Sequence, residues 1–269
     1  MLVTRAITAL VMIVGLACVL FLAPRALWIV FCAIFAAGAA HEWGRLVGLS
    51  RTGGAVFAMA IALYVAILPT LDLPEIYGQV VFAVSSAFWI FLVPYWLWKS
   101  AMPASPGIAM VSGALVIAAA ATALVALRDA GTWFVLAVLG VIWVSDSAAY
   151  FVGSALGRHK LAPGISPGKT WEGVAGAMVF VALYSTAWVH FSDGVLPVAF
   201  TGAPMGWVML MAIMLLLAGL GIYGDLFESY LKRRAGVKDS GRILPGHGGI
   251  LDRIDALLPV LPVAALLFL

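Results

Sequence analysis

Charged residues are scarce in this 269-residue chain: 10% are Asp, Glu, Lys or Arg, whereas 64% are apolar. The mean hydropathy of +1.12 is far above that of an ordinary soluble domain. This scarcity excludes a soluble globular protein, and we expect no nucleic-acid partner. Apolar runs recur almost to the last residue, so no segment remains for a separate soluble domain.

Cysteine is also scarce. The two cysteines, Cys18 and Cys32, both lie within apolar runs, where a thiol usually serves as a small hydrophobic side chain. This excludes a disulfide framework, a cysteine metal site and a redox role. A Walker A spacing is lacking too: no strand is predicted before the segment PGKT at 167–170, which excludes a P-loop NTPase.

What the chain has in abundance is apolar runs of transmembrane length. Windows of roughly 20 residues predict an all-α, polytopic integral membrane protein with about nine transmembrane helices. The windows lie near residues 6–23, 26–48, 54–71, 77–98, 107–127, 132–156, 173–192, 205–226 and 250–269. We divide them into an N-terminal group of about five helices, residues 1–130, and a C-terminal catalytic group, residues 131–269, with cytosolic loops at 157–172 and 227–249.

The positions of Lys and Arg predict the orientation. With nine helices and a cytosolic N-terminus, twelve basic residues lie on the cytosolic side and only Arg25 and Arg128 lie outside, with Arg253 at the start of the last helix. This distribution is what the positive-inside rule predicts. Both long basic loops then face the cytoplasm.

The few charges are concentrated in residues 225–255, which hold eleven of the chain's 15 basic and 12 acidic residues. Asp225 and Glu228 follow one apolar run, and Asp252 and Asp255 open the next. Each pair is spaced three residues apart and therefore shares one helix face. Carboxylates at membrane depth are costly unless they are paired, metal-bound or hydrated. We therefore expect a polar site between the C-terminal helices at the cytosolic face.

The residue types in this segment indicate the chemistry of the site. Carboxylates that converge beneath Lys and Arg side chains suit Mg²⁺ and phosphate groups. The glycines of residues 245–249 precede the last helix, where backbone N–H groups can approach an anion. Two other interpretations stay open here. One is a structural ion-pair network, and the other, for Arg233 and Arg234, is a topology signal or a contact with lipid headgroups.

Three other segments carry polar residues. Lys169, in ISPGKTWEG at 165–173, indicates a phosphate contact. Asp146 lies inside the window 132–156 and is a functional candidate for that reason, with a hydrogen bond between helices as an equal alternative. His41, Glu42 and Trp43 end the second window, and we interpret them as an interfacial anchor rather than as catalytic residues.

The segment 229–255, SYLKRRAGVKDSGRILPGHGGILDRID, resembles the C-terminal signature of the phosphatidate cytidylyltransferases, also called CDP-diacylglycerol synthases. The segments DSAAYFVG and SPGKTWEG resemble that family's middle motifs, so the resemblance runs from about Ser145 to the end. The first 130 residues resemble the family only in being apolar. The matching signature positions are Ser229, Lys232, Arg233, Lys238, Asp239, Gly241, Pro245, His247, Gly248, Gly249, Asp252, Arg253 and Asp255.

The resemblance implies a reaction: CTP and phosphatidate give CDP-diacylglycerol and pyrophosphate, with Mg²⁺ and an optional second cation, at the cytosolic face of a bacterial-type inner membrane. The residues alone indicate a metal, phosphates and a nearby lipid; only the resemblance supplies cytidine. We expect catalytic roles for Asp225, Asp252, Lys169, Lys238 and His247. Substrate binding is expected at Lys232, Arg233, Gly248, Gly249, Arg253 and Ser229, and metal binding at Asp225, Asp252, Asp255 and Asp146.

Two other functions are weighed against this one. Another membrane enzyme that uses CTP on a different lipid, such as a CDP-archaeol synthase or a polyprenol kinase, would share much of the same pattern. A transporter would place polar residues along several helices, whereas the first five windows are nearly free of charge, which disfavours it. The Gly and Ala content suits close helix packing and leaves a homodimer open.

Overall fold

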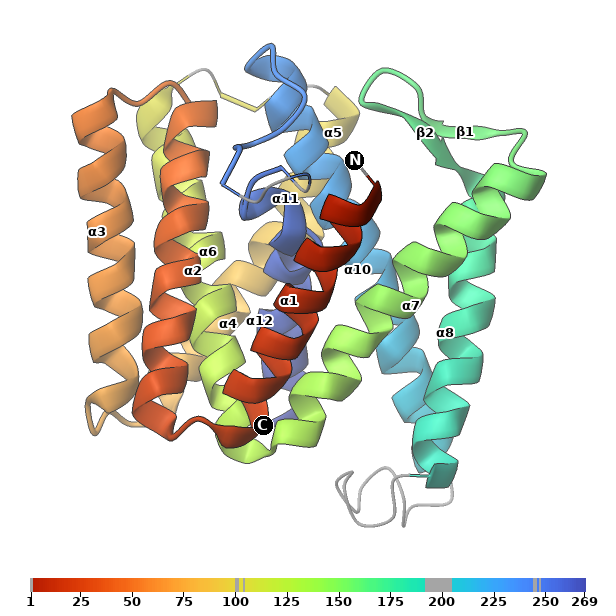
Figure 1. Ribbon diagram of the computed structural model, residues 1–269, viewed down its shortest axis with the longest axis horizontal. Helices are drawn as coiled ribbons and strands as arrows, with labels where there is room; N and C mark the ends of the chain where they lie inside the picture. The colour runs from red at the N-terminus through yellow and green to blue at the C-terminus, as the bar shows by residue number, and fades with distance from the viewer. Residues whose placement is uncertain (1, 100–101, 104, 192–204, 244–245, 247) are drawn as a thin grey trace.

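The computed structural model describes the chain except residues 1, 100–101, 104, 192–204, 244–245 and 247. The described part is a bundle of helices with one two-stranded hairpin (Figure 1). Its first half contains α1 (Leu2–Leu22), α2 (Arg25–Leu46), α3 (Arg51–Ile67), the 3₁₀ turn η1 (Leu68–Thr70), α4 (Ile76–Ala87), the π-helical segment η2 (Phe88–Leu92), α5 (Val93–Lys99) and α6 (Pro106–Ala130). Its second half contains α7 (Thr132–Leu156), β1 (Lys160–Ala162), β2 (Ser166–Thr170), α8 (Trp171–Phe191), α10 (Gly206–Arg234), α11 (Leu251–Ile254) and α12 (Leu257–Phe268).

The helical class predicted from the sequence is confirmed. Among the described residues, seven helices are long and apolar enough to cross a membrane, which supports a multi-pass membrane protein. They are Arg25–Leu46, Arg51–Thr70, Ile76–Lys99, Pro106–Ala130, Thr132–Leu156, Trp171–His190 and Gly206–Arg234. The apolar segments Leu10–Leu22 and Leu257–Phe268 are shorter. They fall within the first and last predicted windows, and the count of nine crossings stays a prediction.

The two groups of helices share one hydrophobic core. In Figure 1, α2 and α3 form one side of the bundle and α7 and α8 the other, while α12 packs against α4, α6 and α10. Within this core, Phe227 of α10 is 1% exposed and its ring lies 5.5 Å from that of Trp89 and 6.1 Å from that of Trp43. Residues 1–130 therefore help to support the C-terminal helices.

The two ends of the bundle differ in character. The hairpin end carries β1 and β2, the end of α10 and residues 235–243, 246 and 248–250 (Figure 1). The Arg25 end, opposite it, carries the connections between α1 and α2 and between α6 and α7 (Figure 1). There Arg25 pairs with Asp129 at 2.9 Å, and Arg128 donates hydrogen bonds to the carbonyl oxygens of Leu20 and Ala23.

Both predicted loops contain more regular structure than expected. The loop at 157–172 forms the antiparallel β1–β2 hairpin, with Lys160 opposite Thr170. α10 continues about two turns beyond the predicted end at residue 226 and reaches Arg234, so the second loop begins at Ala235 rather than at 227. Basic residues in the last turn favour such an extension, because they complement the partial negative charge of a helix C-terminus.

Candidate active site

The hairpin places Lys169 beside α10. Thr170 accepts a hydrogen bond from the Gly173 N–H at 3.1 Å, which satisfies a free donor in the first turn of α8. The Thr170 side chain is buried against Gly157, where a Cβ would come within 2.8 Å of its methyl carbon. With its neighbour fixed in this way, Lys169 reaches across to α10, and its Nζ lies 2.7 Å from Oδ2 of Asp225. The hairpin thus places the Lys169 ammonium group beside Asp225, the first of the predicted site carboxylates.

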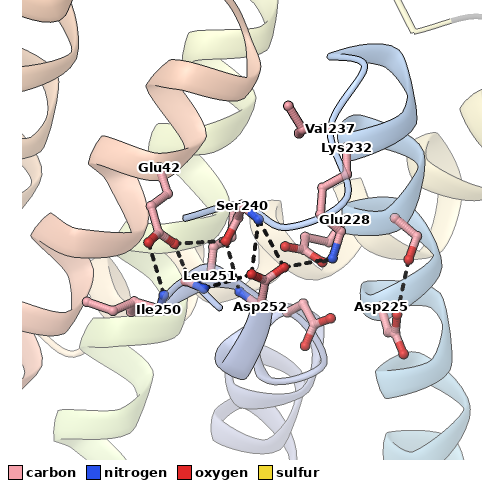
Figure 2. Close-up of polar contacts among 12 residues, drawn as sticks. Glu42, Asp225, Glu228, Lys232, Val237, Ser240, Ile250, Leu251 and Asp252 are labelled. Carbon is pink, nitrogen blue, oxygen red and sulfur yellow. Dashed lines mark hydrogen bonds and ion pairs between the residues drawn. The ribbon is translucent and has the colours of Figure 1, made fainter. Parts of the chain in front are cut away.

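The C-terminal part of α10 carries a row of polar side chains. Ser229 donates a hydrogen bond to Oδ1 of Asp225 at 3.3 Å. Lys232 pairs with Glu228, four residues before it, and its Nζ lies 2.7 Å from Oδ1 of Asp252 (Figure 2). Glu228 is only 2% exposed. One lysine therefore joins the end of α10 to the start of the C-terminal helices.

Asp252 lies in a cradle of backbone donors. Its Oδ2 accepts a hydrogen bond from the Ser240 N–H at 3.0 Å (Figure 2) and another from the Gly249 N–H at 2.8 Å. Gly248 has φ +83, and a Cβ there would lie 2.6 Å from the same oxygen. A side chain at this position would thus be both strained and crowded. Burial alone would raise the pKa of the Asp252 carboxyl, but hydrogen bonds from Lys232 and from the Gly249 N–H lower it to about 2.

Asp255 lies next to α10. A Cβ at Gly224 would overlap the Asp255 carbonyl oxygen, so the glycine allows this close approach. Burial raises the pKa of the Asp255 carboxyl to about 8, and the charges of Asp225 and Asp146 also raise it. Asp252 and Asp255 lie outside the seven candidate spans. Because the charges of Asp225 and Asp146 act on Asp255, these three carboxylates are near enough to repel one another.

These carboxylates are the candidate ligands for a metal ion. In the part of the chain that the structure describes, no three acidic, histidine or cysteine side chains form a ready-made metal-binding group. One oxygen of Asp225 already forms an ion pair with Lys169. The donors nevertheless fit a hard divalent cation, because they are all carboxylate oxygens and their mutual repulsion would be relieved by a positive charge. The metal-binding role of these residues stays a prediction.

The sequence interpretation of Glu42 and Trp43 as an interfacial anchor is wrong. Glu42 is 0% exposed, and its carboxylate accepts hydrogen bonds from the Ile250 N–H at 3.1 Å and the Leu251 N–H at 2.8 Å (Figure 2). Trp43 is 1% exposed and donates a hydrogen bond from its indole N–H to the Ala109 carbonyl oxygen. Acids at membrane depth are costly, and this argument made Asp146 a functional candidate above. Applied to Glu42, the same argument would have made it a candidate as well.

Of the remaining predicted site residues, three are exposed, one is a buried glycine and one lies outside the described chain. Lys238 and Arg253 are exposed near the cradle, and Arg233 donates a hydrogen bond to the Val237 carbonyl oxygen at 3.3 Å. Gly249 lies between Glu42 and Ser240, where a Cβ would overlap both side chains. His247 lies outside the described residues. Its predicted role is therefore not examined by the structure.

Comparison with known proteins extends the resemblance to the whole chain. A sequence profile described as "Cytidylyltransferase family" matches residues 3–269. The chain belongs to this family. A phosphatidate cytidylyltransferase of Pseudomonas aeruginosa is 35% identical, with 99% of this chain and 97% of the relative aligned. The family match includes residues 3–130, which the sequence motifs alone did not connect to it.

Other relatives in the cytidylyltransferase family align over about half of this chain. The phosphatidate cytidylyltransferase of Haemophilus influenzae is 42% identical over 132 residues, which are 49% of this chain and 44% of the relative. That of Bacillus subtilis is 46% identical over 132 residues, 49% of this chain and 46% of the relative. These alignments thus span about half the length of those relatives.

Proposed function

We propose that this protein is a phosphatidate cytidylyltransferase, which converts CTP and phosphatidate into CDP-diacylglycerol and pyrophosphate. The relatives named above carry this activity in their names, and the chain belongs to their family. The observation that carries the proposal is that the Lys169–Asp225 and Lys232–Asp252 ion pairs lie at the same end of an apolar bundle. A polar site of this kind suits a soluble nucleotide that must react with a membrane lipid.

The reaction needs two polyanions to be brought together. The phosphate of phosphatidate is largely ionised near neutral pH, so its oxygen attacks the α-phosphorus of CTP, and the bond to the β-phosphate breaks to release pyrophosphate. Positioning and charge neutralisation supply most of the catalysis in such a transfer. Lys169 and Lys232 would turn from their carboxylate partners to the phosphates, assisted by Arg253, Lys238 and Arg233.

We place Mg²⁺ at Asp225 and Asp255, with Asp146 beside them. Asp252, our other predicted ligand, has both oxygens engaged by Lys232 and backbone donors, and would exchange one of these contacts to bind a cation. The bound cation would neutralise phosphate charge and polarise the reacting phosphoryl group. Gly248 and Gly249 shape the turn beside these carboxylates.

An apolar hollow next to this site suits the acyl chains of the lipid. It has a volume of about 540 Å³ and lies between α5, the hairpin and α10. Tyr223 and Leu226, which line it, stand on either side of Asp225 in the sequence. Tyr95, Trp98 and Ile165 complete the wall toward α5 and the hairpin. A lipid could therefore keep its chains in an apolar environment while its phosphate lies near Lys169.

We propose that the hairpin end faces the cytoplasm of a bacterial-type inner membrane. Arg45 lies in the last turn of α2, Arg51 begins α3 and Lys99 ends α5, all at this end. Arg25 and Arg128 lie at the other. This distribution supports a cytosolic active site by the positive-inside rule.

A transfer assay tests the function. Purified protein receives CTP labelled at the α-phosphate, Mg²⁺ and phosphatidate, and we expect the label in a lipid-soluble product together with one pyrophosphate per turnover. In parallel, CTP labelled at the γ-phosphate distinguishes a lipid kinase, which would transfer that label instead. Replacing phosphatidate with an archaeal ether-lipid phosphate or a polyprenol tests the other acceptors. If phosphatidate, CTP and Mg²⁺ together give no α-labelled lipid, the proposal is refuted.

A further inference from the structure

Glu42 of α2 connects the N-terminal helices to the candidate site. Its carboxylate lies at 0% exposure and accepts three hydrogen bonds: from the Ser240 hydroxyl at 2.9 Å and from the N–H groups of Ile250 and Leu251. These partners lie about 200 residues further along the chain. A buried carboxylate is normally retained only where such donors satisfy it.

Ser240 passes this contact on to Asp252. Its hydroxyl donates to Glu42 and accepts from the Asp252 N–H at 3.3 Å, while its own N–H donates to the Asp252 carboxylate at 3.0 Å (Figure 2). Asp252 in turn binds Lys232. A continuous chain of hydrogen bonds therefore runs from α2 through residue 240 to the end of α10.

The backbone is shaped to admit the Glu42 carboxylate. A Cβ at Gly241 or Gly249 would overlap its oxygens, and a Cβ at Gly38, one turn earlier on α2, would overlap the Ile250 side chain. Three glycines thus let α2 and the segments around Ser240 and Ile250 come into direct contact. Such close approach around one buried acid indicates that Glu42 fixes the position of these segments.

We infer that Glu42 is a positioning residue of the active site, which holds the segments on either side of residues 241–249 so that Asp252, Lys232 and the intervening glycines meet the triphosphate of CTP. This inference rests on the proposed function. It does not make Glu42 a catalytic residue, because the side chain is fully buried and contacts only protein groups. The carboxylate acts through Ser240 and the backbone of Ile250 and Leu251.

The test uses Glu42→Gln, which keeps the size of the side chain but turns an NH₂ group toward backbone N–H donors. We expect the KM for CTP to rise about tenfold or more, since small displacements of a phosphate-binding segment have effects of this order, while the KM for phosphatidate stays unchanged. Glu42→Asp should be intermediate. The matched control is Glu75→Gln, an exposed acid at the Arg25 end, which should change neither constant.

A second readout does not depend on activity. Lys238 and Arg242 are exposed, so trypsin can probe their segment in the purified protein. We expect Glu42→Gln to be cleaved faster at these two residues and to lose the protection that CTP gives the wild type. If wild-type protein shows no transfer but Glu42→Gln is cleaved faster, the proposed function fails and the positioning role of Glu42 stands.

Two results would contradict the positioning role of Glu42. A variant that loses apparent turnover with unchanged KM for CTP and unchanged cleavage would show that Glu42 only supports folding. Should Glu42→Gln not purify as a monodisperse protein, Ser240→Ala removes one of the three donors and should raise the KM for CTP in the same way. An unchanged KM for CTP in Ser240→Ala would then overturn the inference.

Discussion

The two ends of the bundle use charge in different ways. At the Arg25 end, Arg25 is satisfied by Asp129 and the Pro69 carbonyl oxygen, and Arg128 by carbonyl oxygens at the end of α1. At the hairpin end, three acids, Asp225, Glu228 and Asp252, pair with only two lysines, Lys169 and Lys232. Each arginine at the Arg25 end thus has its own partners, whereas three carboxylates that share two lysines suit a ligand that brings its own cation.

Removal of Lys232 should have the largest effect. Lys232→Met leaves Glu228 and Asp252 without their shared cation, and breaking a buried ion pair typically costs about 3–5 kcal/mol. Chemical denaturation in detergent measures this free energy. Adding Glu228→Gln to the same variant should recover part of the loss, and no recovery would mean that Glu228 is not held by Lys232.

Asp225→Asn should leave the fold intact but lower kcat/KM by about 100- to 1000-fold, the usual cost of removing one strong electrostatic group from a reaction site. The matched variant at the other end is Asp129→Asn, whose partner Arg25 is half-exposed. We expect its activity to stay within about twofold of wild type. If kcat/KM fell equally in the two variants, the acids at the two ends of the bundle would not differ in their role in the reaction.

Gly249→Ala should be costly because its Cβ would overlap the side chains of Glu42 and Ser240. Overpacking of this kind typically destabilises by about 1–3 kcal/mol, and we expect activity to fall with it. Gly219→Ala is the matched control on α10, since no atom lies within 4 Å of its Cβ position. Thermal unfolding of the two variants should separate them, and equal melting temperatures would contradict the close contact at Gly249.

The smallest effect should come from Arg25→Gln at the Arg25 end. The Arg25–Asp129 pair is exposed, and such surface ion pairs contribute about 0–1 kcal/mol. We expect a melting temperature close to that of wild type and unchanged transfer activity. A large loss of activity would indicate that this end of the bundle takes part in the reaction.

The sequence predicted those parts of the fold that depend on local pattern. Apolar runs of membrane length gave the helices, and the spacing of Asp225, Glu228, Asp252 and Asp255 gave the polar end of the bundle. The end of α10 was predicted too early, because hydropathy falls at Asp225 while the helix continues through the Glu228–Lys232 pair. The hairpin was not predicted, since its strands are only three and five residues long.

The pairing of site residues could not be predicted, because it depends on packing between distant segments. Lys169 was expected to bind phosphate, but its contact with Asp225 follows from the fold of the hairpin. Glu42 was misinterpreted because its partners Ser240, Ile250 and Leu251 lie about 200 residues away. The cost of an acid at membrane depth marks Glu42 as a candidate, but it does not identify these partners.

The central claim is that the acids of the hairpin end, and not those of the Arg25 end, bind a divalent cation together with the nucleotide. Electron paramagnetic resonance of Mn²⁺, a substitute for Mg²⁺, measures this binding directly in purified protein with CTP. We predict saturable binding in wild type and Asp129→Asn that is lost or weakened at least about tenfold in Asp225→Asn. Unchanged Mn²⁺ affinity in Asp225→Asn, or its loss in Asp129→Asn, would contradict the account.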